Sequence, residues 1–188
     1  MSMIAAMITL TGLVQPALAE TPILLGLRAV GEVWQDPNIA TVYGGGRVAG
    51  SAVISWRPHN VWSIDAEAAM MRVGEDIGPS ISLTPMSLSL CARRGSERTE
   101  VFAGGGVSIV PFLDKGESTI SGTKLGADVK IGVRIATALV QPTLYPVSTV
   151  QGVDLEAFLG RRQHFANGVE DRLDLSAWRV GIGLVARI

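Results

Sequence analysis

The side chains in this chain that could take part in acid–base or nucleophilic chemistry are few. The sequence contains two histidines, His59 and His164, and one cysteine, Cys91. His59 lies in a short polar turn, where we expect a surface residue. The alternating pattern around Cys91 predicts a small inward-facing side chain, and one cysteine provides neither a disulfide nor a pair of metal ligands. His164 is therefore the candidate for a general base.

His164 lies in the polar stretch Arg161-Arg162-Gln163-His164-Phe165-Ala166-Asn167-Gly168. This stretch resembles the His-x-Ser-Asn segment of the outer-membrane lipid A deacylases, which are small barrels. The resemblance implies a base at His164, but Ala166 occupies the position of that family's nucleophilic serine. Acyl transfer needs an activated nucleophile beside its base, so we expect no catalytic residue and no enzyme. A barrel enzyme acting on lipid A near His164 stays an alternative.

Neither the acidic residues nor the glycine runs have the spacing of a ligand site. Five acidic residues of one predicted loop could approach a divalent cation, but the spacing of an EF-hand is absent. They are Asp154, Glu156, Glu170, Asp171 and Asp174. Glycines 44–46 and 104–106 lack the Lys-Ser/Thr that completes a phosphate-binding loop. We expect no metal and no cofactor, and the net charge of −1 offers no basic field for nucleic acid.

Most of the chain alternates between apolar and polar residues with a period of two. Within residues 122–136, the odd positions from 125 to 135 are apolar, and the even positions from 124 to 134 are charged or glycine. Side chains of a strand point alternately to its two faces, so this pattern predicts a strand. Further strands are predicted over 23–34, 48–57, 61–71 and 178–188, and less clearly over 80–93, 99–110 and 139–150. The expected fold is all-β, with eight antiparallel strands.

The N-terminal segment predicts export. Residues 3–14 are apolar but too few to span a bilayer as a helix, and Ala17 and Ala19 fit an A-x-A cleavage site. We expect a signal peptide over residues 1–19 and one barrel domain over 20–188. No other segment has a helical period, except for a turn or two within 155–162.

The predicted connections alternate in length, as in an up-and-down meander. Long connections are expected over 35–47, 111–121 and 151–177, and short ones over 58–60, over 94–98 and near Thr137. Outer-membrane barrels have this rhythm of short turns and longer loops. Within 80–93 the apolar parity changes at Thr84-Pro85, which predicts a bulge at the proline.

Alternation alone does not say whether the apolar face meets a core or lipid. Trp56 and Trp62 flank a short turn and Trp178 opens the last strand, so indoles border an aliphatic band as at a membrane interface. The opposite face carries four charges of each sign, as expected for a narrow lumen filled by ion pairs. These lumen residues are Arg28, Glu32, Asp65, Glu67, Asp128, Lys130, Arg134 and Arg179. If the first strand closes on the last, Glu32 and Arg179 should pair.

The whole mature segment resembles the small outer-membrane β-barrels of the OmpA-like and opacity-protein-like group. The most similar stretches are Val101–Val110, Gly122–Ala136 and Trp178–Ile188. The resemblance implies an eight-stranded antiparallel transmembrane β-barrel in the outer membrane of a Gram-negative bacterium. That family usually ends on an aromatic residue that the outer-membrane assembly machinery recognises, and Ile188 departs from this.

We therefore expect a monomeric outer-membrane barrel with a structural or surface-interaction role. Its partners would be the lipid bilayer and the outer-membrane assembly machinery. A lumen plugged by side chains would leave little or no pore activity, and long external loops would present the interaction surface. The alternative is a periplasmic lipocalin-like carrier, which would keep its aliphatic face around an apolar ligand.

Overall fold

The computed structural model describes residues 23–74, 79–96, 98–115, 119–137, 152–165 and 173–188, most of which lie in strands. The elements are β1 (Ile23–Trp34), α2 (Pro37–Tyr43), β2 (Gly46–His59), β3 (Trp62–Gly74), β4 (Ser80–Leu83), β5 (Met86–Gly95), β6 (Thr99–Lys115), β7 (Thr119–Thr137), β8 (Gly152–His164) and β9 (Ala177–Arg187). The predicted signal peptide, the predicted strand over 139–150 and the turn expected near Thr137 fall wholly or mostly outside the described residues. Among the described residues, no helix is both long and apolar enough to cross a bilayer.

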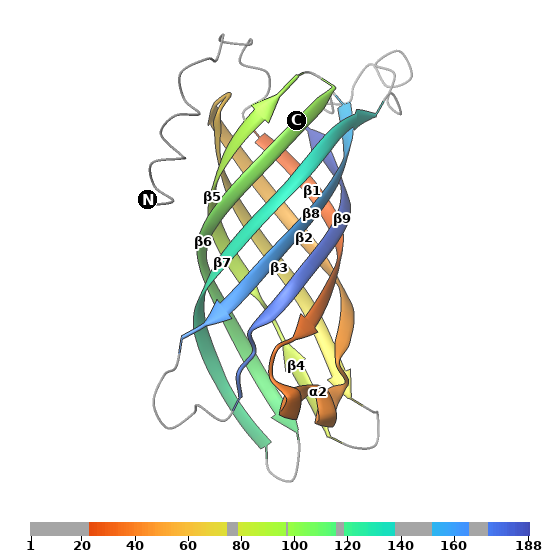
Figure 1. The fold of residues 1–188 in the computed structure, drawn as a ribbon, viewed down its shortest axis with the longest axis vertical. Coiled ribbons are helices and arrows are strands. Elements are labelled where there is room, and N and C mark those ends of the chain that lie inside the picture. The colour runs from red at the N-terminus through yellow and green to blue at the C-terminus, as the bar shows by residue number, and fades with distance from the viewer. Residues whose placement is uncertain (1–22, 75–78, 97, 116–118, 138–151, 166–172) are drawn as a thin grey trace, which may run out of the picture.

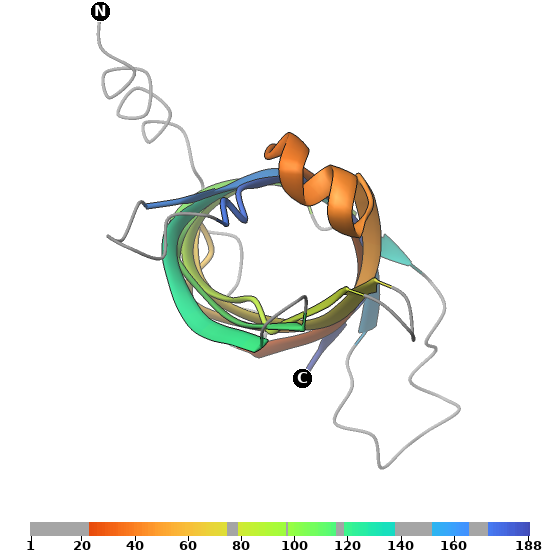
Figure 2. The ribbon, with the colours of Figure 1, turned by 90° about the horizontal axis from the view of Figure 1, so that it is seen from below.

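The strands form one closed antiparallel barrel (Figures 1 and 2). Apart from β4 and β5, each strand pairs with its neighbour in sequence, and β1 also pairs with β9 from Leu24↔Arg187 to Trp34↔Ala177, which closes the ring. β4 and β5 both lie between β3 and β6 and act as one interrupted strand. The barrel therefore has eight positions, as the sequence predicts. All backbone ladders are internal, so closure leaves no free sheet edge.

The two ends of the barrel differ. The start of β1 and the end of β9 lie at one end, which we call the terminal end. α2 lies at the other, which we call the helix end (Figure 1). At the terminal end, residues 60–61 and 96–98 make short connections, as predicted. At the helix end, the connection from β1 to β2 contains α2.

The strands predicted over 23–34, 48–57, 61–71, 122–136 and 178–188 are confirmed. Their alternation is reproduced in the exposure of their side chains. On β1, Leu27 is 72% exposed whereas the next residue, Arg28, is 3% exposed. This difference between neighbours is the pleat of a strand with two unlike environments on its faces.

The long loop predicted over 151–177 is wrong, because its first half is β8. Val153, Leu155 and Leu159 face outward there, and Asp154 and Glu156 face inward, so the period of two is present in the sequence. The density of charge in this segment is unusual for a strand. It is tolerated because the charged positions face other charges across the lumen.

The long connection predicted over 111–121 is also wrong. β6 and β7 continue past the aliphatic band and stay paired as far as Lys115↔Thr119. The helix α2 was not predicted. It begins at Pro37, with Asp36 as N-cap accepting from the N–H of Asn38 at 2.8 Å. An Asp-Pro pair is a recognised signal for the start of a helix. It is easy to overlook here because the helix has only seven residues.

The bulge predicted at Thr84-Pro85 is wrong as well. Met71 pairs with Leu83 and Ala68 with Met86, so the register against β3 does not change across the proline. What changes is the environment of each face. Leu83 faces inward into an apolar cluster, whereas the outward side becomes apolar from Met86 onward. The apolar side chains therefore change from the inner face to the outer face of the wall while the strand register stays the same.

Candidate functional site in the barrel lumen

The inner face of the barrel wall carries an extended ion-pair network. All eight residues predicted to line the lumen lie on this face and are at most 5% exposed. Burying so many charges costs several kcal/mol for each one unless it is paired and hydrogen-bonded. The network therefore depends on which strands bring opposite charges together.

Arg179 on β9 is the centre of the network. Its Nε donates to Glu32 at 3.1 Å, its Nη1 to Asp128 at 2.7 Å and its Nη2 to Glu67 at 2.7 Å. These carboxylates stand on β1, β7 and β3, so one guanidinium links strands from several sides of the lumen. The expected pairing of Glu32 with Arg179 is present, and the two are direct partners across the β1–β9 seam. Arg162 on β8 donates to the same Glu32 carboxylate at 3.0 Å.

A second set of pairs links β1 to β3 and β8, and β8 to β7. Nη1 of Arg28 donates to Glu67 at 2.7 Å, and its Nη2 contacts Glu156. Glu156 also accepts from Nε of Arg134 at 3.1 Å. Glu156 and Arg162 are missing from the predicted lumen set because the prediction treats their strand as a loop.

Asp65 on β3 lies toward the terminal end and is surrounded by donors. Arg93 lies 3.1 Å and Lys130 3.0 Å from its carboxylate oxygens. The hydroxyls of Ser55 and Ser63 donate to it at 2.6 and 2.8 Å. Two cations and two hydroxyls thus stabilise one buried carboxylate.

The last carboxylate before the terminal mouth is Glu100 on β6. It lies 2.8 Å from Arg57, 2.7 Å from Arg93 and 3.5 Å from Arg134. Arg57, Arg93 and Glu100 were not predicted as lumen residues, although the parity of β2 places Arg57 on the inward side. With these additions, the network extends from mid-barrel to the terminal mouth.

Two phenylalanines fill the space between the ion pairs. Phe158 lies under the guanidiniums of Arg28 and Arg179, at 5.1 and 5.7 Å from the ring centroid. A Cβ at Gly181 would lie 2.2 Å from Cε1 of Phe158, so the glycine provides the room for this ring. Phe102 occupies the corresponding space beside Gly132, 2.4 Å from the position of a Cβ there. Lumen glycines therefore make room for large side chains on neighbouring strands.

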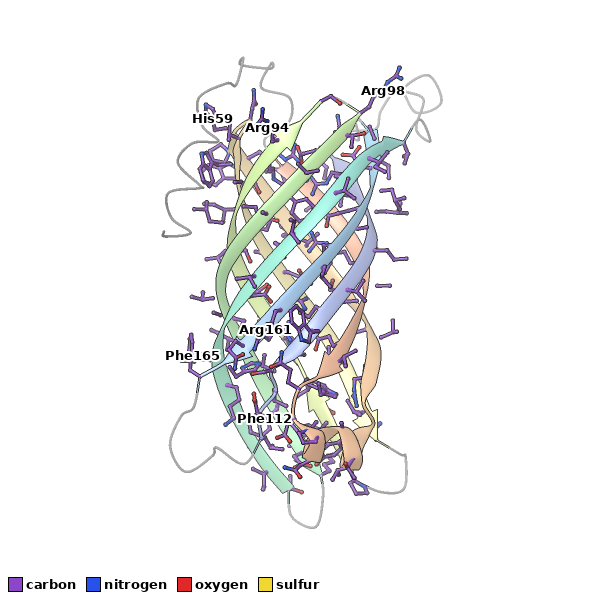
Figure 3. The ribbon with its side chains drawn as sticks, in the orientation of Figure 1. His59, Arg94, Arg98, Phe112, Arg161 and Phe165 are labelled. Atoms are coloured by element: carbon purple, nitrogen blue, oxygen red, sulfur yellow. The ribbon has the colours of Figure 1, made fainter. Side chains whose placement is uncertain are left out.

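The outer face is an aliphatic band. Leu27, Ile131 and Ile182 are each more than 60% exposed and project away from the barrel. Within the described part of the chain, no charged side chain projects outward between Arg94 near the terminal end and Arg161 near the helix end (Figure 3). The predicted interface tryptophans are exposed on this face. Trp56 and Trp62 border its terminal end, and Trp178 borders its helix end.

Solved structures with this architecture come from outer membranes. No protein-family model and no curated protein sequence matches the chain. The N-terminal β-barrel domain of Pseudomonas aeruginosa OprF aligns with a TM-score of 0.55 at 11% identity, covering 87% of this chain and 96% of that one. Neisserial surface protein A aligns with a TM-score of 0.55 at 13% identity, covering 88% of this chain and 96% of that one. Ail, the attachment invasion locus protein of Yersinia pestis, aligns with a TM-score of 0.55 at 10% identity, covering 90% of this chain and 99% of that one.

The fold is that of a small outer-membrane β-barrel. In a barrel of this type the aliphatic band meets lipid, and the ion-pair network fills the lumen toward the terminal end. Toward the helix end the lumen content changes from charged to apolar. Trp34, Phe112, Ile81 and Leu83 form the centre of this cluster, and Ile39 of α2 packs into it from the mouth. Trp34, unlike the other described tryptophans, is thus a lumen residue.

α2 is tied to the rim of this outer-membrane barrel by polar contacts. The hydroxyl of Tyr43 donates to Asp114 on β6 at 2.6 Å. Arg47 stacks on the Trp34 ring at 5.5 Å and donates to the carbonyl oxygen of Tyr43 at 2.9 Å. The helix therefore lies at the mouth as part of the packed interior.

His164 ends β8 and points inward. The residue is 8% exposed, and neither ring nitrogen has a hydrogen-bond partner among the described residues. The nearest serine in the hydrogen-bond network, Ser176, accepts from the backbone N–H of His164 at 3.0 Å. Ala166 lies outside the described residues, as do two of the five acidic residues considered above. No grouping of three potential metal ligands occurs in the described part of the chain.

Proposed function

We propose that this protein is an outer-membrane barrel with a structural or surface-interaction role and with little or no pore activity. The observation that carries the proposal is the division of the barrel wall into an aliphatic outer face and a charged inner face. A soluble barrel carrying an apolar ligand needs the opposite arrangement, with aliphatic side chains around a central cavity. The lipocalin-like carrier is therefore not favoured.

The outer face supports insertion in a bilayer. A closed barrel satisfies every backbone hydrogen bond internally, which lipid requires. The aliphatic band bordered by Trp62 at one end and Trp178 at the other matches a hydrocarbon layer with interfacial aromatic residues. The terminal end would face the periplasm, since export from an N-terminal signal peptide fits that side and two of its connections, residues 60–61 and 96–98, are short, although the connection between β7 and β8 is longer.

The inner face supports a plugged lumen. Arg179 and its three carboxylates cross the barrel interior, and Phe158 and Phe102 fill the gaps beside them. The apolar cluster with α2 adds a second obstruction toward the helix end. An ion would have to separate buried pairs and then pass a hydrophobic constriction. Both steps are unfavourable.

The surface-interaction role would belong to the connections at the helix end, which would face outward. The architecture is shared with Ail, an attachment invasion locus protein, one structure of which holds the heparin analogue sucrose octasulfate. That binding is a property of Ail. For this chain it supports only the idea that such a barrel can present a binding surface. We propose no catalytic cycle, because among the described residues neither a nucleophile nor an orienting carboxylate is hydrogen-bonded to the His164 ring.

Two measurements test this proposal. Purified protein should require detergent and should migrate differently on detergent gels before and after boiling, because folded membrane barrels resist unfolding by detergent. Reconstituted in planar bilayers, it should give no stable conductance steps under conditions in which an open porin conducts. Solubility without detergent would contradict the membrane location, and stable conductance would contradict the plugged lumen. An altered lipid A on overexpression would favour the enzyme instead.

A further inference from the structure

Arg161 is the one outward-facing arginine of the described residues that is stacked on a tryptophan. It stands on β8 directly across from Trp178 on β9, and its guanidinium carbon lies 5.4 Å from the indole centroid. Leu159, the preceding outward residue, belongs to the aliphatic band. Arg161 therefore lies where the band ends, on the outside of the barrel and near the helix end (Figure 3).

A chain of hydrogen bonds holds the guanidinium in place. Nη2 of Arg161 donates to the side-chain oxygens of Gln35 at 3.2 Å and Gln163 at 2.8 Å. The amide nitrogen of Gln163 donates to Oγ of Ser176 at 3.1 Å, which directs the Gln163 oxygen toward the arginine. Ser176 is fully buried and its carbonyl oxygen accepts from the N–H of Gln35 at 3.0 Å. The planar group is thus preorganised by neutral acceptors.

The charge of Arg161 is not neutralised by the part of the protein that the structure describes. The lumen arginines Arg28, Arg93, Arg162 and Arg179 each lie within ion-pair distance of a carboxylate. No described carboxylate pairs with Arg161, and its Nε is buried without a hydrogen-bond partner there. Nη2 is occupied by the two glutamines and Nε is buried, so Nη1 is the guanidinium nitrogen that can donate to an oxyanion at the edge of the apolar surface.

We propose that Arg161 and Trp178 form a binding site for the phosphate groups of outer-leaflet glycolipid, the phosphorylated lipid A headgroup. The inference rests on the proposed function, because it needs the helix end to face outward. Acyl chains would lie along the aliphatic band below Leu159, which places a headgroup phosphate level with Arg161. Arg161 donates from Nη1, and the indole screens one face of the guanidinium from water.

Arg72 supplies a matched control. It is also outward-facing and exposed, and it follows Met70 at the helix end of β3. β3 lies on the opposite side of the barrel from β8, and no ring contact or hydrogen bond involves the Arg72 side chain among the described residues. A general attraction between cationic rims and anionic lipid would involve both arginines equally.

The test uses the full mature chain in phosphatidylcholine nanodiscs, titrated with bisphosphorylated lipid A and followed by native mass spectrometry. Arg161→Gln should weaken binding about 10- to 100-fold, as expected for loss of hydrogen bonds to a charged group. Arg72→Gln should weaken it about threefold or less. Arg161→Lys should give an intermediate loss because the charge remains while the stacking on Trp178 and the hydrogen bonds that hold the guanidinium in place are lost. Dephosphorylated lipid A should bind wild type and Arg161→Gln alike, and inorganic phosphate should not compete.

Equal losses for the two glutamine variants would overturn the site, as would undiminished binding of dephosphorylated lipid A. Competition by inorganic phosphate would show that the Arg161 site binds free anions instead of lipid A. Each variant is first checked for heat-modifiable migration, so that a folding defect is recognised. If the wild type itself lacks this migration and needs no detergent, the proposed function fails. If the wild type behaves as a membrane barrel and Arg161→Gln binds as tightly as wild type, only the lipid site fails.

Discussion

Glu32 on β1 and Arg179 on β9 face each other across the seam that closes the barrel, with Nε of Arg179 3.1 Å from the Glu32 carboxylate. The first and last strands are the most distant in sequence, so this pair joins the closure of the sheet to the charge network inside it. The same guanidinium reaches Glu67 and Asp128. Barrel closure and lumen filling are therefore coupled through one side chain.

Replacing Arg179 tests this coupling. Arg179→Met keeps much of the side-chain volume but leaves three buried carboxylates without their shared cation. We expect the free energy of unfolding to fall by about 3–5 kcal/mol, the usual cost of an uncompensated buried charge. Urea titration in lipid vesicles, followed by tryptophan fluorescence, measures the change. Arg98→Gln, at an exposed position on the terminal rim (Figure 3), should change stability by less than about 0.5 kcal/mol. A loss below about 1 kcal/mol for Arg179→Met would show that the network is not stabilising.

The direction of the aliphatic face is tested on β7. Ile131 is 61% exposed on the outer face, near mid-strand. Ile131→Arg should cost about 2–4 kcal/mol if this position meets the middle of the bilayer. Ile120→Arg, on the same strand but beyond the band, should cost about 1 kcal/mol or less. Equal small effects in vesicle unfolding experiments would place Ile131 in water.

The packing of Phe158 against Gly181 gives a test by double substitution. Gly181→Ala places a methyl group within the Phe158 ring and should destabilise the barrel by about 1–3 kcal/mol. Phe158→Leu combined with Gly181→Ala should recover part of that loss, because the smaller side chain vacates the space. Gly50→Ala is the control, since a Cβ at Gly50 meets nothing within 4 Å. Additive effects in the double variant would argue against direct contact.

The contact between Tyr43 and Asp114 predicts a pH dependence at the helix end. Burial, and then the neighbouring Asp114 carboxylate, raises the pKa of the Tyr43 phenol above its ordinary value. The neutral phenol is therefore favoured in the folded state. Its contribution is fully present below the pKa of the unfolded chain, about 10, and is lost as the pH rises toward the folded value. Tyr43→Phe should cost about 1 kcal/mol near neutral pH.

The stability difference between wild type and Tyr43→Phe should shrink between pH 9 and pH 11, around the ordinary tyrosine value of about 10. Unfolding titrations of both proteins at matched pH values measure this difference, and effects of other titrating groups cancel in it. A difference that stays constant across this range would mean that folding does not raise the pKa of the Tyr43 phenol.

The alternation of neighbouring residues in the sequence was sufficient to predict most of the strands and to assign each residue to one of the two faces. Alternation is a property of neighbouring residues, so Leu27 and Arg28 could be placed on opposite faces without knowledge of any other strand. The charge balance of the inward positions could be recognised for the same reason. The segment from Gly152 to His164 had the same alternation, but its many charges suggested a loop until opposite charges across the lumen were known.

The pairing of each charge was decided by the tertiary structure. Whether Arg179 reaches Glu67 and Asp128 depends on strand tilt and register around the closed ring, which no local pattern contains. The inward orientation of Leu83 depends likewise on an apolar cluster gathered from separate strands and α2. Chain-local alternation determined which side of the wall each residue occupies. Ring closure decided what each residue meets there, because contacts across a barrel join positions far apart in the sequence.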